Sequence, residues 1–161
     1  MSYYARTLLA ILAAFMFGAS FAHAQNATPF SKLHGSWSGG GSIILSDGTK
    51  ERIRCRAVYS AADVSLLLEL RCASDSYNFE LQSNLNYESG SIVGDWTESS
   101  RGISGTISGG ASGDRIQVVA ASPMFTATLN LTTQGDRQSI RMQSPGSEIS
   151  EISVYLNRIS K

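Results

Sequence analysis

Apolar and polar residues alternate along most of the chain after residue 35. The clearest case runs from Tyr77 to Tyr87, where every second residue is apolar or Ser and the residues between are Asn, Glu or Gln. A strand places successive side chains on opposite faces, whereas a helix would spread them around its circumference. The pattern therefore predicts strands with one buried and one solvated face.

About ten short strands of this kind follow one another, separated by turn sequences such as Asp47-Gly48 and the glycine-rich stretch 109–113. This spacing predicts an all-β domain over residues 35–161. Because the connections are short, we expect an up-and-down antiparallel barrel of about 8–10 strands, whose closure removes exposed sheet edges. A β-sandwich is the alternative architecture.

The first 24 residues have the pattern of a secretory signal peptide. Arg6 precedes a short apolar run, and Ala22-His-Ala24 is a small-x-small cleavage site. The apolar run is too short to span a bilayer, and no later stretch qualifies, so we expect no membrane span after cleavage. Residues 25–34 are predicted to form an exposed leader. We expect a periplasmic or secreted protein.

The charge balance excludes one class of partner. The chain has 13 basic and 13 acidic residues, and its formal net charge is zero. Binding to nucleic acid calls for a basic face, so we do not expect a nucleic-acid partner.

The two cysteines lie on neighbouring predicted strands. Cys55 and Cys72 both fall on the inner face of one hairpin, nearly equidistant from its turn at residues 60–63. An oxidising compartment favours a disulfide between them, which would hold the hairpin in register. Two buried free thiols are the alternative.

Gly35-Ser-Trp37 opens the first strand and resembles the G-x-W signature of calycins, the lipocalin-like barrels. In that family the Trp closes one end of the barrel, and a basic residue of the last strand packs over it. The resemblance implies that Trp37 and Arg158 form this barrel-end pair. It names no ligand.

A longer pattern joins Gly35-x-Trp37-x-Gly39-x-Gly41 to Asp47-Gly48 and to Ile53-Arg-Cys-Arg-Ala57. It resembles a group of small, secreted, uncharacterised bacterial β-barrel proteins. The resemblance implies an exported compact β domain and no activity.

Large apolar residues on the inner faces are the candidates for lining a ligand chamber. They are Ile53, Tyr59, Leu68, Tyr77, Phe79, Leu81, Trp96 and Phe125. The same residues can instead fill the interior completely, so the sequence leaves open whether the barrel is hollow or packed.

Four arginines share an outer face and form a possible surface patch: Arg52, Arg54, Arg56 and Arg71. Such a patch can bind an anion or a partner protein. Alternatively Glu51, Glu69 and Glu80 lie near enough in sequence to pair with some of the arginines and make an ordinary solvated face.

No set of residues predicts catalysis, a metal site or a cofactor site. His34 is the one histidine after the cleavage site and precedes the first predicted strand. It leaves no second histidine for a zinc site and none for a catalytic triad away from that end of the chain. We therefore expect no enzyme activity, no metal and no cofactor.

Two functions remain. The first is an exported binding protein that holds a small apolar molecule in the barrel, and the second is a protein-interaction module such as a hydrolase inhibitor. An outer-membrane barrel would carry apolar outer faces, and the charged residues at Arg52, Arg54, Arg56 and Glu80 argue against it.

Overall fold

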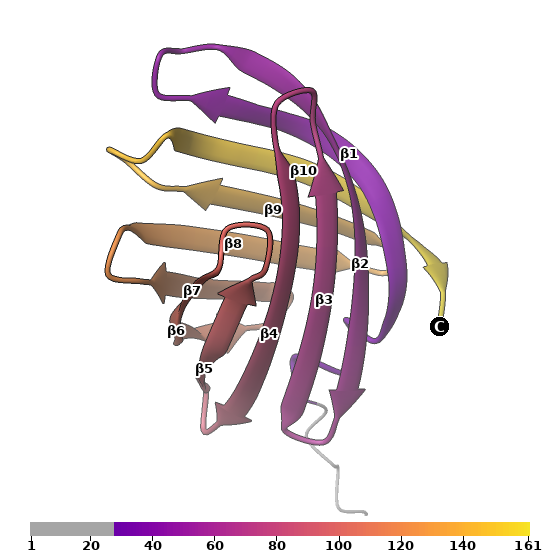
Figure 1. The fold of residues 1–161 in the computed structure, drawn as a ribbon. Coiled ribbons are helices and arrows are strands. Elements are labelled where there is room, and N and C mark those ends of the chain that lie inside the picture. Colours follow the sequence, from indigo (N-terminus) through magenta and orange to yellow (C-terminus); the bar gives the residue numbers. More distant parts are fainter. Residues whose placement is uncertain (1–27) are drawn as a thin grey trace, which may run out of the picture.

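A computed structural model describes residues 28–161, which form ten β-strands joined by short turns (Figure 1). The strands are β1 (Gly35–Leu45), β2 (Lys50–Ala62), β3 (Ser65–Ala73), β4 (Asn78–Glu88), β5 (Ser91–Glu98), β6 (Ile103–Ser112), β7 (Arg115–Ala121), β8 (Thr126–Gln134), β9 (Arg137–Gln143) and β10 (Ile149–Ser160). The predicted signal peptide lies outside the described residues.

The strands form a closed antiparallel barrel in which each pairs with its neighbours in sequence and β1 pairs with β10. The predicted all-β, up-and-down barrel is therefore confirmed. In Figure 1 strands β2, β3 and β4 stand upright in the foreground, and β7 to β10 cross behind them in a second layer. The barrel thus has a front and a back layer whose strands cross each other.

The seam between β1 and β10 depends on glycine. A Cβ added at Gly39 would lie 2.0 Å from the carbonyl oxygen of Tyr155, and one at Gly41 would lie 1.8 Å from that of Ser153. Neither position can hold a side chain without moving the facing backbone. These two glycines let the first and last strands approach and close the barrel.

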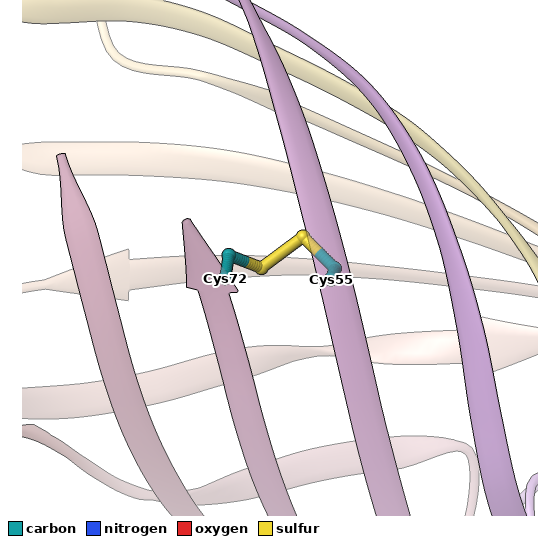
Figure 2. Close-up of a disulfide and its surroundings, with 2 residues drawn as sticks. All are labelled: Cys55 and Cys72. Atoms are coloured by element: carbon teal, nitrogen blue, oxygen red, sulfur yellow. A yellow bond between two sulfur atoms is a disulfide. The ribbon is translucent and has the colours of Figure 1, made fainter. Parts of the chain in front are cut away.

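The disulfide joins the inner faces of β2 and β3. Cys55 and Cys72 are directly paired in the ladder, their Cα atoms lie 4.1 Å apart, and the S–S bond is 2.09 Å long (Figure 2). The predicted bridge between these cysteines is confirmed, and both thiols are taken up by it. The bridge crosses between neighbouring strands and faces the interior.

Two predictions about local structure are corrected. Residues 28–34 are not an exposed leader, because Phe30 and Leu33 are 0% and 2% exposed and belong to the core. The glycine-rich stretch 109–113 is also not the turn that was expected. Strand β6 continues to Ser112, and the turn lies at Gly113 and Asp114, where Gly113 has a positive φ of 61°.

Candidate functional site

The two ends of the barrel differ. At the end where β1 begins and β10 finishes, Phe30 and Leu33 pack inside the barrel, and Phe30 contacts Tyr87 edge-on at 6.2 Å between ring centroids. Trp37 is completely buried, and its indole N–H donates to the carbonyl oxygen of Leu33 over 2.7 Å. Side chains of residues 28–34, called the N-terminal segment, therefore close this end of the barrel. It is called the sealed end below.

Arg158 holds the closing segment in place. Its guanidinium lies 4.1 Å from the centre of the Trp37 ring and donates to the carbonyl oxygens of Lys32 and His34. Its Nε also donates to Asp136 over 2.8 Å. The structure thus places Arg158 over Trp37, as the calycin resemblance implies, and adds backbone contacts that the sequence did not indicate.

Below this seal lies a short chain of buried polar groups. The hydroxyl of Tyr59 donates to Gln138 over 2.9 Å, and the amide of Gln138 donates to Thr133 over 3.3 Å. Burial raises the pKa of Tyr59 well above its ordinary value. These groups satisfy one another, so they do not offer a free polar site to a ligand.

In the middle of the barrel and toward the opposite end, inward-facing apolar side chains remain half-buried. In a closed barrel such side chains meet solvent through the interior or the ends of the barrel, so the inward faces keep some exposed apolar surface. They come from both layers: Leu68, Leu70, Phe79, Leu81, Ile103, Phe125, Leu129, Ile140, Met142 and Ile152. This end is called the open end below.

Aromatic rings and one cation form part of the rim of the open end. Tyr77 and Phe79 stack with their planes 10° apart, and the Arg101 guanidinium lies 5.5 Å and 5.1 Å from their ring centres. The Tyr77 hydroxyl donates to Glu148 over 2.8 Å, and this hydrogen bond raises the pKa of Tyr77. The loops before β4 and β10 are thereby joined at the rim.

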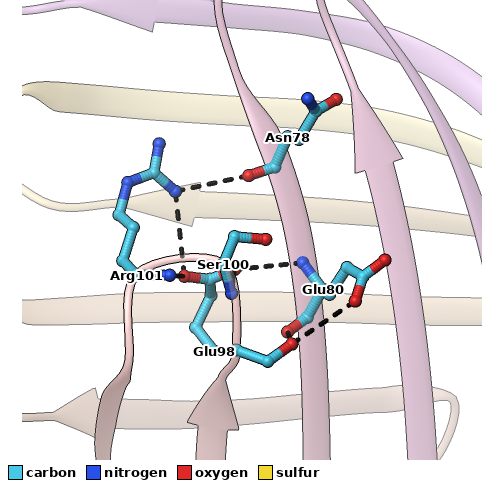
Figure 3. A network of polar contacts seen from close by, with 6 residues as sticks. Asn78, Glu80, Glu98, Ser100 and Arg101 are labelled. Carbon is cyan, nitrogen blue, oxygen red and sulfur yellow. Dashed lines mark hydrogen bonds and ion pairs between the residues drawn. The ribbon is translucent and has the colours of Figure 1, made fainter.

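Glu98 fixes the loop that carries Arg101. Its carboxylate accepts backbone N–H bonds from Glu80 (3.1 Å), Ser100 (3.0 Å) and Arg101 (2.8 Å), as Figure 3 shows around this residue. Burial alone would raise the pKa of Glu98, but the three N–H donors outweigh it and the pKa is lowered. The carboxylate is therefore a structural anchor for this loop.

The indole nitrogen of Trp96 is buried and has no hydrogen-bond partner. The residue is 4% exposed, and its Nε1 is the one buried side-chain nitrogen or oxygen without a hydrogen bond among residues 28–161. The indole contacts Phe125 at 5.7 Å and lies over Gly105, where an added Cβ would come within 2.8 Å of Nε1. A buried N–H without an acceptor costs free energy, which an acceptor could recover.

The structure places all eight predicted lining residues on the inner surface. Tyr77, Phe79, Leu81 and Phe125 are half-buried around the open end, and Leu68 is half-buried opposite Tyr59. Ile53, Tyr59 and Trp96 are buried. Ile53 and Tyr59 thus belong to the packed core. Sequence reasoning missed Arg101, Glu98 and the sealing pair Phe30 and Leu33. An apolar pair three residues apart in a polar leader was the available signal for the seal.

The four patch arginines lie together on the outside of β2 and β3. Arg52, Arg54, Arg56 and Arg71 are all exposed, and Arg56 stands directly opposite Arg71 in the ladder. Within the described residues Arg71 has one acidic neighbour, Glu80, at 3.9 Å, and the other three arginines have none within 4 Å. Glu51 faces inward instead, where it accepts from Ser74 and from the N–H of Ser76.

Two further findings concern residues 28–161. No helix there is long and apolar enough to cross a membrane, and no three potential metal-ligating side chains form a group. His34 lies at the sealed end, where its Nδ1 accepts the N–H of Ala61 over 3.3 Å.

No family model matches the chain, and no curated protein matches it in sequence. Solved structures share its fold. The protein Rv2717c from M. tuberculosis has a TM-score of 0.61 at 17% identity, over 80% of this chain and 93% of that one. The S-type phycobiliprotein lyase CPES from Guillardia theta has a TM-score of 0.54 at 9% identity, over 82% and 90% of the two chains. These likenesses establish a shared barrel fold.

Proposed function

We propose that this protein binds a small, mainly apolar molecule in the open end of its barrel. The observation that carries the proposal is the difference between the ends. Aromatic and aliphatic side chains close one end, while inward-facing side chains such as Leu81 and Leu129 stay accessible at the other. Ligand sites are typically concave and apolar, with few polar groups. The unpartnered N–H of Trp96 would favour a ligand with one hydrogen-bond acceptor.

The likeness to other barrels supports binding only at the level of architecture. One protein with this fold is named a phycobiliprotein lyase, and a lyase must bind the molecule on which it acts. The same barrel architecture is therefore compatible with a binding function. We propose binding rather than catalysis for this chain, because the inward carboxylate of Glu98 is already occupied by backbone donors.

We further propose that the protein works outside the cytosol. The signal-peptide pattern at residues 1–24 and the disulfide both support export, because disulfides persist in oxidising compartments.

A neutral, environment-sensitive dye such as Nile red tests the binding proposal. We expect its fluorescence to rise on adding the protein, and Leu81→Trp or Leu129→Trp to weaken the binding about tenfold or more by filling the chamber. Val93→Trp is the matched control, because Val93 is 54% exposed on the outside of β5. Equal binding by all the variants, or no binding by the wild type, would refute the proposal.

Native mass spectrometry of the protein purified from its own host gives an independent test. A small mass that is lost on denaturation would support the proposal and identify the ligand.

A protein-interaction module is the second candidate function. The exposed arginines of β2 and β3 favour it. Like charges beside one another destabilise a sheet, so such a cluster is more easily explained by a binding role than by stability.

A further inference from the structure

The outer face of β2 carries four cations in a row. Lys50, Arg52, Arg54 and Arg56 alternate with inward-facing residues, and all four are exposed. At about 3.3 Å per residue the row is about 20 Å long, with successive charges about 6.6 Å apart. These four residues are called the cationic stripe.

The surface beside the stripe is hollowed. The β1 residues that face the three arginines are Ser38, Gly40 and Ser42, which are too small to cover them, whereas Ile44 faces Lys50. One hollow of about 450 Å³ extends from Ser38 on β1 past Arg54, Arg56 and Arg71 to Asn78 and Glu80 on β4. A second, of about 440 Å³, is lined by Gly41, Ser42, Lys50, Glu51 and Arg52. The Glu51 carboxylate in this lining already accepts from Ser74 and from the N–H of Ser76. The two hollows lie beside successive members of the cationic stripe, and together they are called the trough.

Nearby acidic residues do not neutralise the stripe. Arg71 extends the positive charge onto β3 and meets Glu80 only at 3.9 Å, between side chains that are 77% and 56% exposed. Glu151 on β10 is held by Arg141 at 2.9 Å. Glu69 lies on β3 opposite Val58 and has no ion pair within the described part of the chain. Like charges opposite one another, as at Arg56 and Arg71, destabilise a sheet.

Exposed apolar side chains flank the trough. Tyr155 of β10 stands opposite Gly40, across the trough from Arg54, and is 69% exposed. Val58 and Leu67 continue the surface beyond Arg56 and are 36% and 53% exposed. Tyrosine and arginine are enriched in protein interfaces, particularly among the residues that dominate binding energy.

From these observations we infer that the trough over β1 and β2 docks an extended acidic segment of a partner protein. An extended peptide repeats every second residue at the same spacing as the cationic stripe, so alternating carboxylates can meet successive guanidinium groups. The barrel is closed and has no free edge, so the partner binds through side chains and does not add a strand. The inference builds on the second candidate function and is independent of ligand binding in the barrel.

The test uses a short, fluorescently labelled peptide in which glutamate alternates with serine. Its binding to the full mature protein is measured by fluorescence anisotropy. We expect salt-sensitive binding that Arg54→Glu/Arg56→Glu weakens about tenfold or more. Arg115→Glu/Arg137→Glu is the matched control, because both residues are exposed on other strands. This control variant is expected to bind the peptide as the wild type does.

Two further measurements keep the outcome decisive. The single variant Arg56→Glu places a negative charge directly opposite Arg71, so its thermal midpoint should not fall although its peptide binding weakens.

A single-stranded oligonucleotide of equal charge serves as the competing polyanion. Peptide binding that survives the double reversal, or binding of the oligonucleotide as tight as that of the peptide, would overturn the inference. Nile red binding should stay unchanged in all of these variants, which separates this test from that of the ligand chamber.

Discussion

Glu98 shows how a single buried carboxylate organises the rim of the barrel. It is 6% exposed and accepts three backbone N–H bonds from two different chain segments. Because these donors favour the ionised form, the pKa of Glu98 is lower in the folded protein than in the unfolded chain. The associated stability is therefore present above the ordinary value of 4.5 and is lost as the pH falls through the lowered pKa.

We expect Glu98→Gln to lower the free energy of unfolding at neutral pH by about 1–3 kcal/mol, since an amide presents one acceptor oxygen to three donors. Urea unfolding at neutral and acidic pH measures the effect, which should shrink below the folded-state pKa of the wild type. Glu80→Gln is the control, because Glu80 is exposed and its ion pair is long. A loss of stability that is the same at both pH values would contradict this account of the carboxylate.

Arg158 stabilises the sealed end because its planar guanidinium can make several contacts at once. The group covers Trp37 and donates at once to Asp136 and to two backbone carbonyl groups. We expect Arg158→Lys to cost about 1–3 kcal/mol, because a single ammonium cannot satisfy these acceptors together. Chemical denaturation followed by Trp fluorescence measures it, with the exposed Arg137→Lys as control. If lysine restored full stability, charge alone rather than the planar fork would hold the seal.

Among the elements, the β2–β3 hairpin is covalently locked. The disulfide closes a sequence separation of 17 residues, which corresponds to about 3 kcal/mol in the chain-entropy treatment. We expect the double variant Cys55→Ser/Cys72→Ser to lose stability of this order in denaturant titrations. The reduced wild type should match it, and reductant should leave the double variant unchanged. A stability that does not depend on reductant in the wild type would exclude this role.

The elements also show where periodicity predicts structure and where it does not. Alternation identified the inner faces of β2 and β4 because the outer positions include three arginines in β2 and are Asn, Gln or Glu in β4. It misplaced the turn after β6 because Gly109 and Gly110 carry no side chain to mark a face. Cross-strand pairing with β7 keeps this glycine-rich stretch in the sheet.

At the scale of the whole molecule, the N-terminal segment decides that the barrel has one accessible end. Phe30 is completely buried against Tyr87. We expect Phe30→Ala to cost about 3–5 kcal/mol, because it leaves a cavity in the seal. Urea unfolding gives the magnitude, and the 76% exposed Met124→Ala is the control for an apolar truncation at the other end. Unchanged stability would mean that the segment lies on the barrel without supporting it.

The sequence by itself determined the all-β class, the up-and-down order, the faces of most strands and the pairing of Cys55 with Cys72. These properties follow from local alternation and short turns, which act between neighbours in the chain. Only the tertiary structure decided that Phe30 seals one end, that Glu98 is saturated by N–H donors and that Tyr155 faces Arg54 across Gly40. The seal at Phe30 and the approach of Tyr155 to Arg54 depend on barrel closure, which brings the first and last strands together. The contacts of Glu98 depend on the turn after β5 and on the pairing of β5 with β4. Periodic alternation of apolar and polar residues indicates none of these contacts.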